Sequence, residues 1–216
     1  MYSYFVILSM VGKSTLLCEI LHEKEYQFEY DIEQLVYIYT IEDDNIRKLK
    51  KKFSKNGLFL KEIPENLPEL LIPKKSVLCI DDKEEEIVGN KRTTKLVNTL
   101  CKVWVHHCSL ICFLLFQSFD MFYKRNPLNP ILQQSTRLIL FKSVSNFASL
   151  KRWLNGYSIK LKANQTLFDC FNDLTTGDKY AYLILDLSPN LNSPHVYSNI
   201  LYADPRPLLV FHVEPE

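Results

Sequence analysis

A short apolar run near the amino terminus leads into a Gly-Lys-Ser-Thr sequence, and this succession constrains the fold more than any other feature. Tyr4–Leu8 has the aromatic and β-branched composition of a buried strand. Gly12-Lys13-Ser14-Thr15 follows, and the apolar spacing of residues 16–21 is typical of a helix. A strand, a glycine turn and a helix in this order indicate a phosphate-binding loop, in which backbone N–H groups and a lysine hold the phosphates of a nucleotide.

The first half of this loop departs from the full phosphate-binding pattern. The pattern places a glycine where this chain has Ile7, and Ser9-Met10-Val11 stands where glycine and proline would ease the turn. A β-branched residue resists the left-handed backbone conformations that such a turn uses. Two explanations stay open: a re-routed loop that binds phosphate more weakly, or an inactive chain that has kept the fold.

A second apolar run ends in paired acids. Val77–Ile80 is predicted to form a buried strand, and Asp81 and Asp82 follow it directly. In phosphate-loop enzymes such a strand delivers one carboxylate to the shell of Mg²⁺ and a second one that orients or deprotonates the attacking water. We therefore expect Asp81 in the metal shell, together with the Ser14 hydroxyl, and Asp82 beside the water.

A third apolar run, Leu110–Phe116, ends at Gln117. The carboxyl ends of parallel strands share one edge of a sheet, so Lys13, Asp82 and Gln117 are expected to meet there. Lys13 would neutralise phosphate charge, and Gln117 would contact the γ-phosphate or hold the water. The predicted cofactors are ATP and Mg²⁺. The predicted catalytic residues are Lys13, Asp82 and Gln117. The predicted nucleotide-binding residues are Gly12, Lys13, Ser14 and Thr15. The predicted metal ligands are Ser14 and Asp81.

Strand-like and helix-like segments alternate along the whole chain. Its 216 residues suit one α/β domain, residues 1–216, with a mostly parallel central sheet, helices on both faces and antiparallel strands at the carboxyl-terminal end. Residues 81–89 are predicted to form a polar loop. Further strands are predicted at 35–40, 137–141, 180–186 and 208–213, longer helices at 41–52, 91–107, 146–154 and 165–174, and short helical turns at 67–71 and 131–134.

The balance of charge excludes a globally basic surface. The chain has 26 Lys and Arg against 25 Asp and Glu, so any contact with a polyanion must come from a local patch or from a channel between subunits. The basic run Lys48–Lys52 is a candidate patch, although such a run is also typical of a solvated helix end.

The six cysteines contain no CxxC pair and no zinc spacing, which favours buried thiols in a reducing compartment.

No export or membrane signal is recognisable in the sequence. The longest apolar stretch, Leu110–Phe116, is far shorter than the roughly 20 residues of a membrane-spanning helix, and the amino terminus lacks a charged region with a long apolar core. We therefore expect an intracellular, non-secreted protein without a membrane partner.

Three segments also resemble a known family. His106–Phe119 contains a double histidine before a buried strand that ends in Gln117, Ser135–Lys142 forms a further strand, and Tyr182–Pro189 is a late strand followed by an acid and a proline. In this order the segments resemble the genome-packaging ATPases of large and mid-sized DNA viruses and of Polinton/Maverick-type elements, in the FtsK–HerA branch of phosphate-loop ATPases. The resemblance runs from Phe5 to about Leu201.

This resemblance implies a ring of identical subunits that hydrolyses ATP between neighbours and drives double-stranded DNA into a capsid. The implied partners are double-stranded DNA, further copies of the chain and a capsid protein, and the implied location is the nucleus or cytoplasm of a host cell, or the virion. Many relatives carry an arginine after the double histidine, where this chain has Cys108. Arg92 and Arg137 are the remaining candidates for an arginine that reaches a neighbouring subunit.

Two further functions fit parts of the sequence. A catalytically inactive relic of the same fold would have a structural or regulatory role, and the departure at Ile7 favours it. A small-molecule or nucleotide kinase would share the loop but needs several arginines in a lid over the phosphates, and the loop around Asn126–Pro130 carries only Arg125. The sequence thus favours the ATPase over the kinase.

Overall fold

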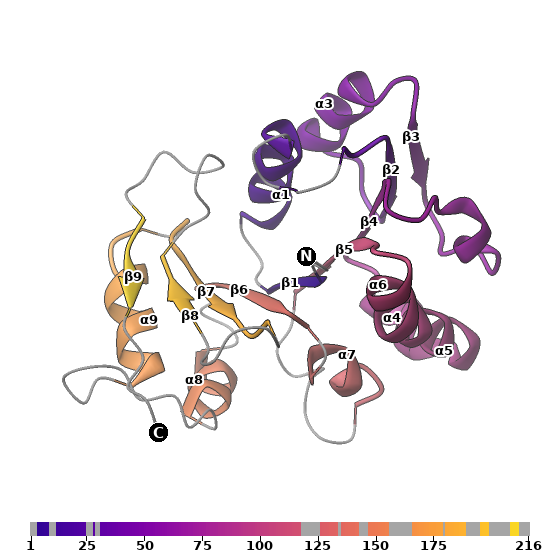
Figure 1. Ribbon diagram of the computed structural model, residues 1–216. Coiled ribbons are helices and arrows are strands. Elements are labelled where there is room, and N and C mark those ends of the chain that lie inside the picture. The colour runs from indigo at the N-terminus through magenta and orange to yellow at the C-terminus, as the bar shows by residue number, and fades with distance from the viewer. Residues whose placement is uncertain are drawn as a thin grey trace.

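The computed structural model describes residues 4–8, 12–24, 28, 31–117, 126–133, 135–142, 147–155, 166–178, 180–188, 195–198 and 208–211. These residues form one nine-stranded sheet in the order β3-β2-β4-β5-β1-β6-β7-β8-β9 (Figure 1). The strands are β1 (Tyr4–Leu8), β2 (Gln34–Tyr39), β3 (Gly57–Leu60), β4 (Ser76–Asp81), β5 (Ile111–Phe116), β6 (Arg137–Phe141), β7 (Tyr182–Asp186), β8 (His195–Tyr197) and β9 (Val210–Phe211).

Helices connect most of these strands. They are α1 (Lys13–His22), α3 (Asp44–Lys52), α4 (Glu84–Gly89), α5 (Lys91–Thr99), α6 (Val105–His107), α7 (Asn129–Gln133), α8 (Phe147–Asn155) and α9 (Leu167–Thr175), with a 3₁₀ turn η1 (Leu67–Leu70) and a π-helical turn η2 (Leu100–Trp104). No helix in the described ranges combines the length and apolarity that crossing a bilayer requires.

The strands from β3 to β6 are parallel, and β7, β8 and β9 continue the sheet as antiparallel strands. This confirms the predicted mostly parallel sheet with antiparallel strands at one edge. β5 lies between β1 and β4, so that Val6 pairs with Leu114 and Ile80 pairs with Leu114 from the other side. The carboxyl ends of β1, β5 and β4 are therefore adjacent along one edge of the sheet.

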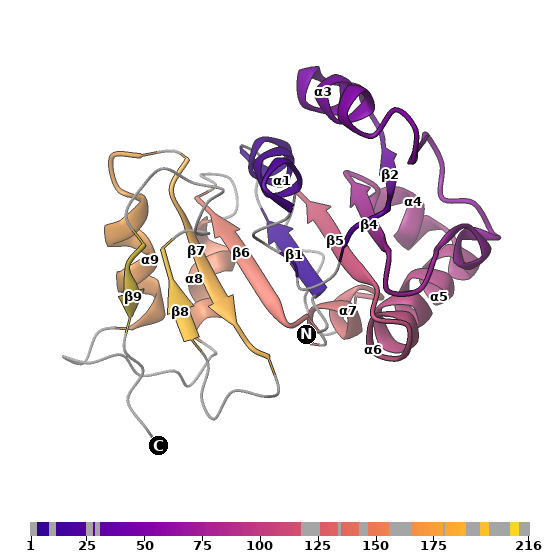
Figure 2. The same cartoon turned by 45° about the horizontal axis from the view of Figure 1, so that its top comes forward.

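Alternating side chains divide the core into two layers, as the period of a strand requires. On β1, Val6 and Leu8 belong to one layer, whereas Phe5 and Ile7 belong to the other. Helices α1 and α3 cover the Phe5 face, and the remaining longer helices, including α5, α8 and α9, cover the Val6 face (Figure 2). Both faces of the sheet are covered, as predicted.

Four elements differ from the sequence prediction. Residues 81–89 do not form only a polar loop, because α4 begins at Glu84; three acids in its first turn suit the positive end of the helix dipole. Gly57, where no strand was predicted, begins the edge strand β3. β8 is a further strand, of three residues, that was not predicted. Only Val210 and Phe211 of the predicted strand 208–213 are in β9, and residues 212 and 213 lie outside the described part.

Candidate functional site

Gly12 provides the turn between β1 and α1. Its φ angle is 91°, in the left-handed region that favours glycine, and it is the N-cap of α1. A Cβ atom at this position would lie 2.9 Å from Cε1 of Phe141, the last residue of β6. Only glycine fits here without strain, and it allows Lys13 to begin the helix.

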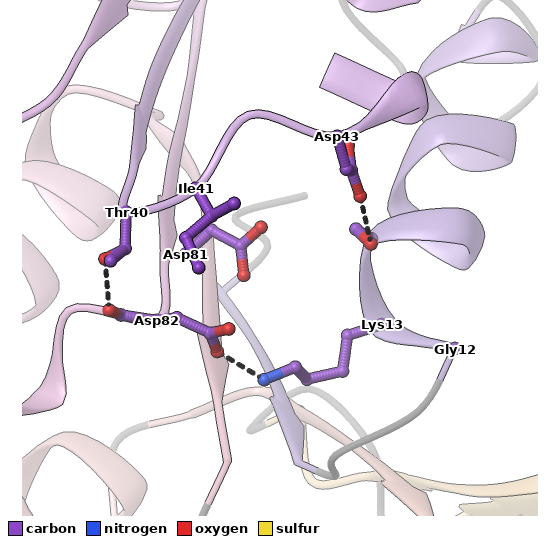
Figure 3. A pocket seen from close by; sticks show the side chains of 8 residues that line it. Gly12, Lys13, Thr40, Ile41, Asp43, Asp81 and Asp82 are labelled. Atoms are coloured by element: carbon purple, nitrogen blue, oxygen red, sulfur yellow. Dashed lines mark hydrogen bonds and ion pairs between the residues drawn. The ribbon is translucent and has the colours of Figure 1, made fainter.

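The Lys13 side chain is buried and pairs with Asp82. It is 6% exposed, and its Nζ lies 2.6 Å from Oδ1 of Asp82 (Figure 3). Gln117 reaches the same carboxylate, since its Nε2 donates to Oδ2 at 2.7 Å. The three predicted catalytic residues therefore meet at one carboxylate, although they follow three different strands.

Asp82 has a constrained backbone just beyond the end of β4. Its φ angle is 52°, its N–H donates to the carbonyl oxygen of Leu115 at 3.1 Å, and its carbonyl oxygen accepts from Oγ1 of Thr40 at 2.6 Å. A non-glycine residue in the left-handed region costs free energy, and the surrounding contacts must hold it. These bonds aim the Asp82 carboxylate at Lys13 and Gln117.

Asp81 is the last residue of β4 and is buried. The hydroxyl of Tyr37 donates to its Oδ2 at 2.9 Å. Burial, followed by the neighbouring charge of Asp82, raises the pKa of Asp81 to about 7, while Lys13 and the Tyr37 hydrogen bond act in the opposite direction. At neutral pH this carboxyl is therefore poised between its protonated and ionised forms.

Ser14 and Thr15 both contact the start of α3. The hydroxyl of Ser14 donates to Oδ2 of Asp43 at 3.1 Å, and Nδ2 of Asn45 donates to Oγ1 of Thr15 at 3.2 Å. Asp43 is the N-cap of α3, because its Oδ1 accepts from the N–H of Ile46 at 2.8 Å. The sequence prediction placed Asp43 in the first turn of a helix but not in the site; the signal was its position just after a parallel strand.

A pocket of about 250 Å³ lies between these side chains, and the residues that line it are Gly12, Lys13, Ser14, Thr40, Ile41, Asp43, Asp81 and Asp82. A second cavity of about 430 Å³ shares Thr40, Ile41 and Asp82 with it, and its wall includes Gln117. Thr15 is not among the described residues that line either space. The predicted site is thus largely one connected concave region, with Thr15 beside it.

The position of Ile7 changes how the loop is understood. Ile7 is a fully buried residue within β1 and pairs with Leu115 and Ile139 of the neighbouring strands. It lies in extended backbone, so the expected conflict with a left-handed turn does not arise. Ser9-Met10-Val11 lies outside the described residues.

The donor set suits a hard divalent cation. The Ser14 hydroxyl and the carboxylates of Asp81, Asp82 and Asp43 are oxygen ligands of the kind that Mg²⁺ prefers. No group of three or more His, Cys, Asp or Glu side chains in the described ranges is arranged to hold a metal by itself. Mg²⁺ typically binds through one or two carboxylates together with phosphate oxygens and water.

The candidate arginines lie elsewhere. Arg137 begins β6, so it is at the opposite end of that strand from Phe141 and the Gly12 turn; its Nε is 2.9 Å from Oδ2 of Asp186. Arg92 lies on the exposed side of α5, where its Nη1 is 3.4 Å from Oε1 of Glu65. Each arginine is therefore held by a carboxylate away from the site.

Comparison with known proteins gives little beyond the geometry. No protein-family model matches the chain, and no curated protein matches it. Among solved structures, the cytoplasmic domain of EssC is similar, with a TM-score of 0.48 and 14% sequence identity; the match covers 76% of this chain and 36% of that chain. This chain thus spans about a third of the length of that neighbour. The function is therefore inferred from the site itself.

Proposed function

We propose that this chain binds ATP with Mg²⁺ at the carboxyl edge of its parallel strands and hydrolyses it. The observation that carries the proposal is the convergence of Lys13, Asp82 and Gln117 within hydrogen-bonding distance. A buried ammonium group at the start of a helix, next to several carboxylates, is suited to a polyphosphate that arrives with a divalent cation.

The roles of the side chains follow from their positions. Lys13 and the first N–H groups of α1 hold the phosphates, and the Ser14 hydroxyl and Asp81 hold Mg²⁺. The metal would supply positive charge against the β- and γ-phosphates. Asp82 accepts a proton from the attacking water, and Gln117 keeps the Asp82 carboxylate and the water in position.

Lys13 exchanges partners when the phosphates bind. Without nucleotide its ammonium group is neutralised by Asp82, and the phosphates compete for the same ammonium group. Once Lys13 contacts phosphate, Asp82 loses its cation but keeps the hydrogen bond from Gln117. The carboxylate is then available to accept a hydrogen bond from the attacking water, which couples substrate binding to hydrolysis.

The finer proposal is that hydrolysis drives double-stranded DNA through a ring of identical subunits into a capsid. It is supported by the ordered resemblance of residues 106–119, 135–142 and 182–189 to viral packaging ATPases. A ring also brings an arginine from a neighbouring copy within reach of the γ-phosphate, where it would complete the positive charge around that group.

A second candidate function is that of an inactive relic with a structural or regulatory role, and the closed Lys13–Asp82 ion pair favours it. Such a chain would keep the pair as a permanent structural link. The position of Ile7 does not favour it, because Ile7 is a core residue of β1. An Ile7→Gly variant is expected to lose stability by more than about 2 kcal/mol, and not to gain ATP binding.

Phosphate release from ATP separates the two functions. We expect Mg²⁺-dependent turnover by the wild-type chain, stimulated by double-stranded DNA. Asp82→Asn should reduce kcat by at least about 100-fold. ATP binding should be retained, with an unchanged or lower Kd, because the variant removes the carboxylate that competes with the phosphates for Lys13. Asp31→Asn removes an equal charge before the amino end of β2 and should leave both unchanged. Nucleotide binding without turnover by the wild-type chain would establish the relic instead.

A further inference from the structure

A groove of about 560 Å³ runs along α5, on the Val6 face of the sheet. Its walls come from α4, α5 and η2 on one side and from Pro127 and Pro130 beside and within α7 on the other. Lys91, Lys95 and Lys102 line it, and its described lining contains neither an acidic nor an aromatic side chain. In Figure 1 the helices α4, α5 and α6 stack together with α7 nearby.

The three lysines form a single row. Lys91 and Lys95 are one helical turn apart, about 6 Å of rise, and Lys102 continues the same face after the π-helical turn begins. The row extends over about 15 Å, a distance along which one strand of a DNA duplex presents about four phosphates. The spacing of the positive charges therefore suits a nucleic-acid backbone.

The ammonium groups in this row are not used inside the described part of the protein. In the described ranges, no ion pair or hydrogen bond is made by the ammonium group of Lys91, Lys95 or Lys102, and all three side chains are exposed. The adjacent Arg92, in contrast, lies 3.4 Å from Glu65 and does not line the groove. A row of charges without carboxylate partners attracts anions, and salt weakens this attraction.

The basic run that the sequence suggested as a DNA contact differs in this respect. Lys50 is paired with Glu42 and the Tyr39 hydroxyl, and Nζ of Lys52 donates to the carbonyl oxygen of His22 at 2.6 Å. The ammonium groups of Lys50 and Lys52 therefore already have partners within the chain. The structure favours α5 over the Lys48–Lys52 run as the surface for a polyanion.

Asn98 lies in the groove between Lys95 and Lys102. Its Oδ1 is buried and has no hydrogen-bond donor among the described residues, although a buried acceptor without a partner costs about 1–3 kcal/mol. Amide, lysine and threonine side chains are the groups that proteins use to contact nucleic-acid phosphates, directly or through bound water. Because Oδ1 and a phosphate oxygen are both acceptors, the Asn98 amide would reach a phosphate through its Nδ2 group or through a bridging water.

We propose that the α5 groove binds the phosphate backbone of double-stranded nucleic acid without reading its sequence. The absence of aromatic side chains from its described lining favours a duplex over a single strand, whose bases stack on aromatic rings. The proposal rests on the translocation function proposed above and deepens it by locating its DNA contact.

α4 joins the two regions: Val88 lines the groove, and Glu84 accepts a hydrogen bond from the backbone N–H of Gln117 at the proposed nucleotide site.

The test measures DNA binding without nucleotide, so that a failed ATPase assay does not decide it. The triple variant Lys91→Ala/Lys95→Ala/Lys102→Ala is compared with Lys48→Ala/Lys51→Ala/Lys55→Ala, which removes three exposed lysines elsewhere. Fluorescence anisotropy follows a labelled duplex of about 30 base pairs from about 50 to 200 mM salt. Thermal unfolding of both variants confirms that they are folded.

We expect the α5 variant to bind the duplex at least about tenfold more weakly at low salt and to reduce the slope of log K against log salt by about 2 to 3. The control variant should stay within about threefold of the wild-type chain. Equal losses in both variants, no loss in the α5 variant, or no duplex binding by the wild-type chain would overturn the proposal. Lysine-dependent binding of phosphatidylserine vesicles or polyglutamate, but not of the duplex, would overturn it in favour of another partner.

Discussion

Lys13 determines the chemistry of the site at the scale of single residues. Its side chain is 6% exposed, and a charge so enclosed requires a counter-ion. Asp82 supplies that counter-ion in the structure, and a phosphate would supply it in a nucleotide complex. The same ion pair therefore stabilises the empty site and must open for the proposed reaction.

Gly12→Ala tests the backbone of the turn. The variant places a Cβ atom 2.9 Å from Phe141 at a φ of 91°, so we expect a loss of about 1–3 kcal/mol in the free energy of unfolding. Urea denaturation measures this loss. Gly89→Ala is the matched control, because a Cβ atom there meets nothing within 4 Å and the helix α4 should gain up to about 1 kcal/mol. Equal stability of Gly12→Ala and the wild-type chain would contradict the described turn.

Asp81→Asn tests the buried carboxyl through pH. The pKa of Asp81 is about 7 in the folded chain and has a reference value of 3.8, so the unfolded chain releases this proton first as pH rises. Wild-type stability therefore falls between about pH 4 and pH 7, by as much as about 4 kcal/mol from this group. Asparagine avoids this loss and can still accept the Tyr37 hydrogen bond.

Denaturation in metal-free buffer at several pH values measures the difference between Asp81→Asn and the wild-type chain. The advantage of the variant should grow from pH 4 to pH 7 and then level off. A difference that does not change with pH would show that the carboxyl is not held in its neutral form.

At the scale of elements, the sequence predicted the strands and helices with strong apolar patterns. β1 and β5 are apolar throughout, and β4 is apolar between Ser76 and Asp81. The site edge followed from the rule that parallel strands end together. Short or polar elements were missed, because β3 and β8 have few residues and α4 begins with three acids that resemble a loop. Hydrophobic periodicity cannot detect elements that neighbouring strands and buried contacts hold in place.

The same limit applies to the site. Lys13, Asp82 and Gln117 were predicted because each follows a strong strand, and the structure brings them together. Asp43 and Thr40 were not assigned to the site, since their contribution depends on which strand is next to β4 in the sheet. The pairing of β2 with β4 belongs to the tertiary structure, and a single sequence does not reveal which strands are neighbours.

The pairing of β6 and β7 yields a prediction about the antiparallel half. Arg137 and Asp186 are direct cross-strand partners, and the Asp186 side chain is 8% exposed. Arg137→Met leaves a buried carboxylate without its cation and should cost about 3–5 kcal/mol. The double variant Arg137→Met/Asp186→Leu should recover most of that loss. Urea denaturation of the four chains of the cycle measures the coupling, and strictly additive losses would contradict a buried ion pair.

At the scale of the whole molecule, the proposed nucleotide site lies where the two layers meet at the sheet edge. The α1 and α3 layer contributes Lys13, Ser14 and Asp43, whereas the chain passes from Asp82 into α4 and α5 on the opposite face (Figure 2). The phosphates of a bound nucleotide would therefore lie next to elements of both layers. This arrangement places α4 between the proposed nucleotide pocket and the lysine groove on α5.

Calorimetric titration of ATP and Mg²⁺ into the wild-type chain tests the central claim most directly. The account predicts saturable binding that weakens by at least about 30-fold, roughly 2 kcal/mol, in Lys13→Met. Lys75→Met, which removes an exposed lysine just before the amino end of β4, should bind within about twofold of the wild-type chain. No binding up to millimolar ATP, or equal affinity in Lys13→Met and the wild-type chain, would contradict a nucleotide site built around Lys13.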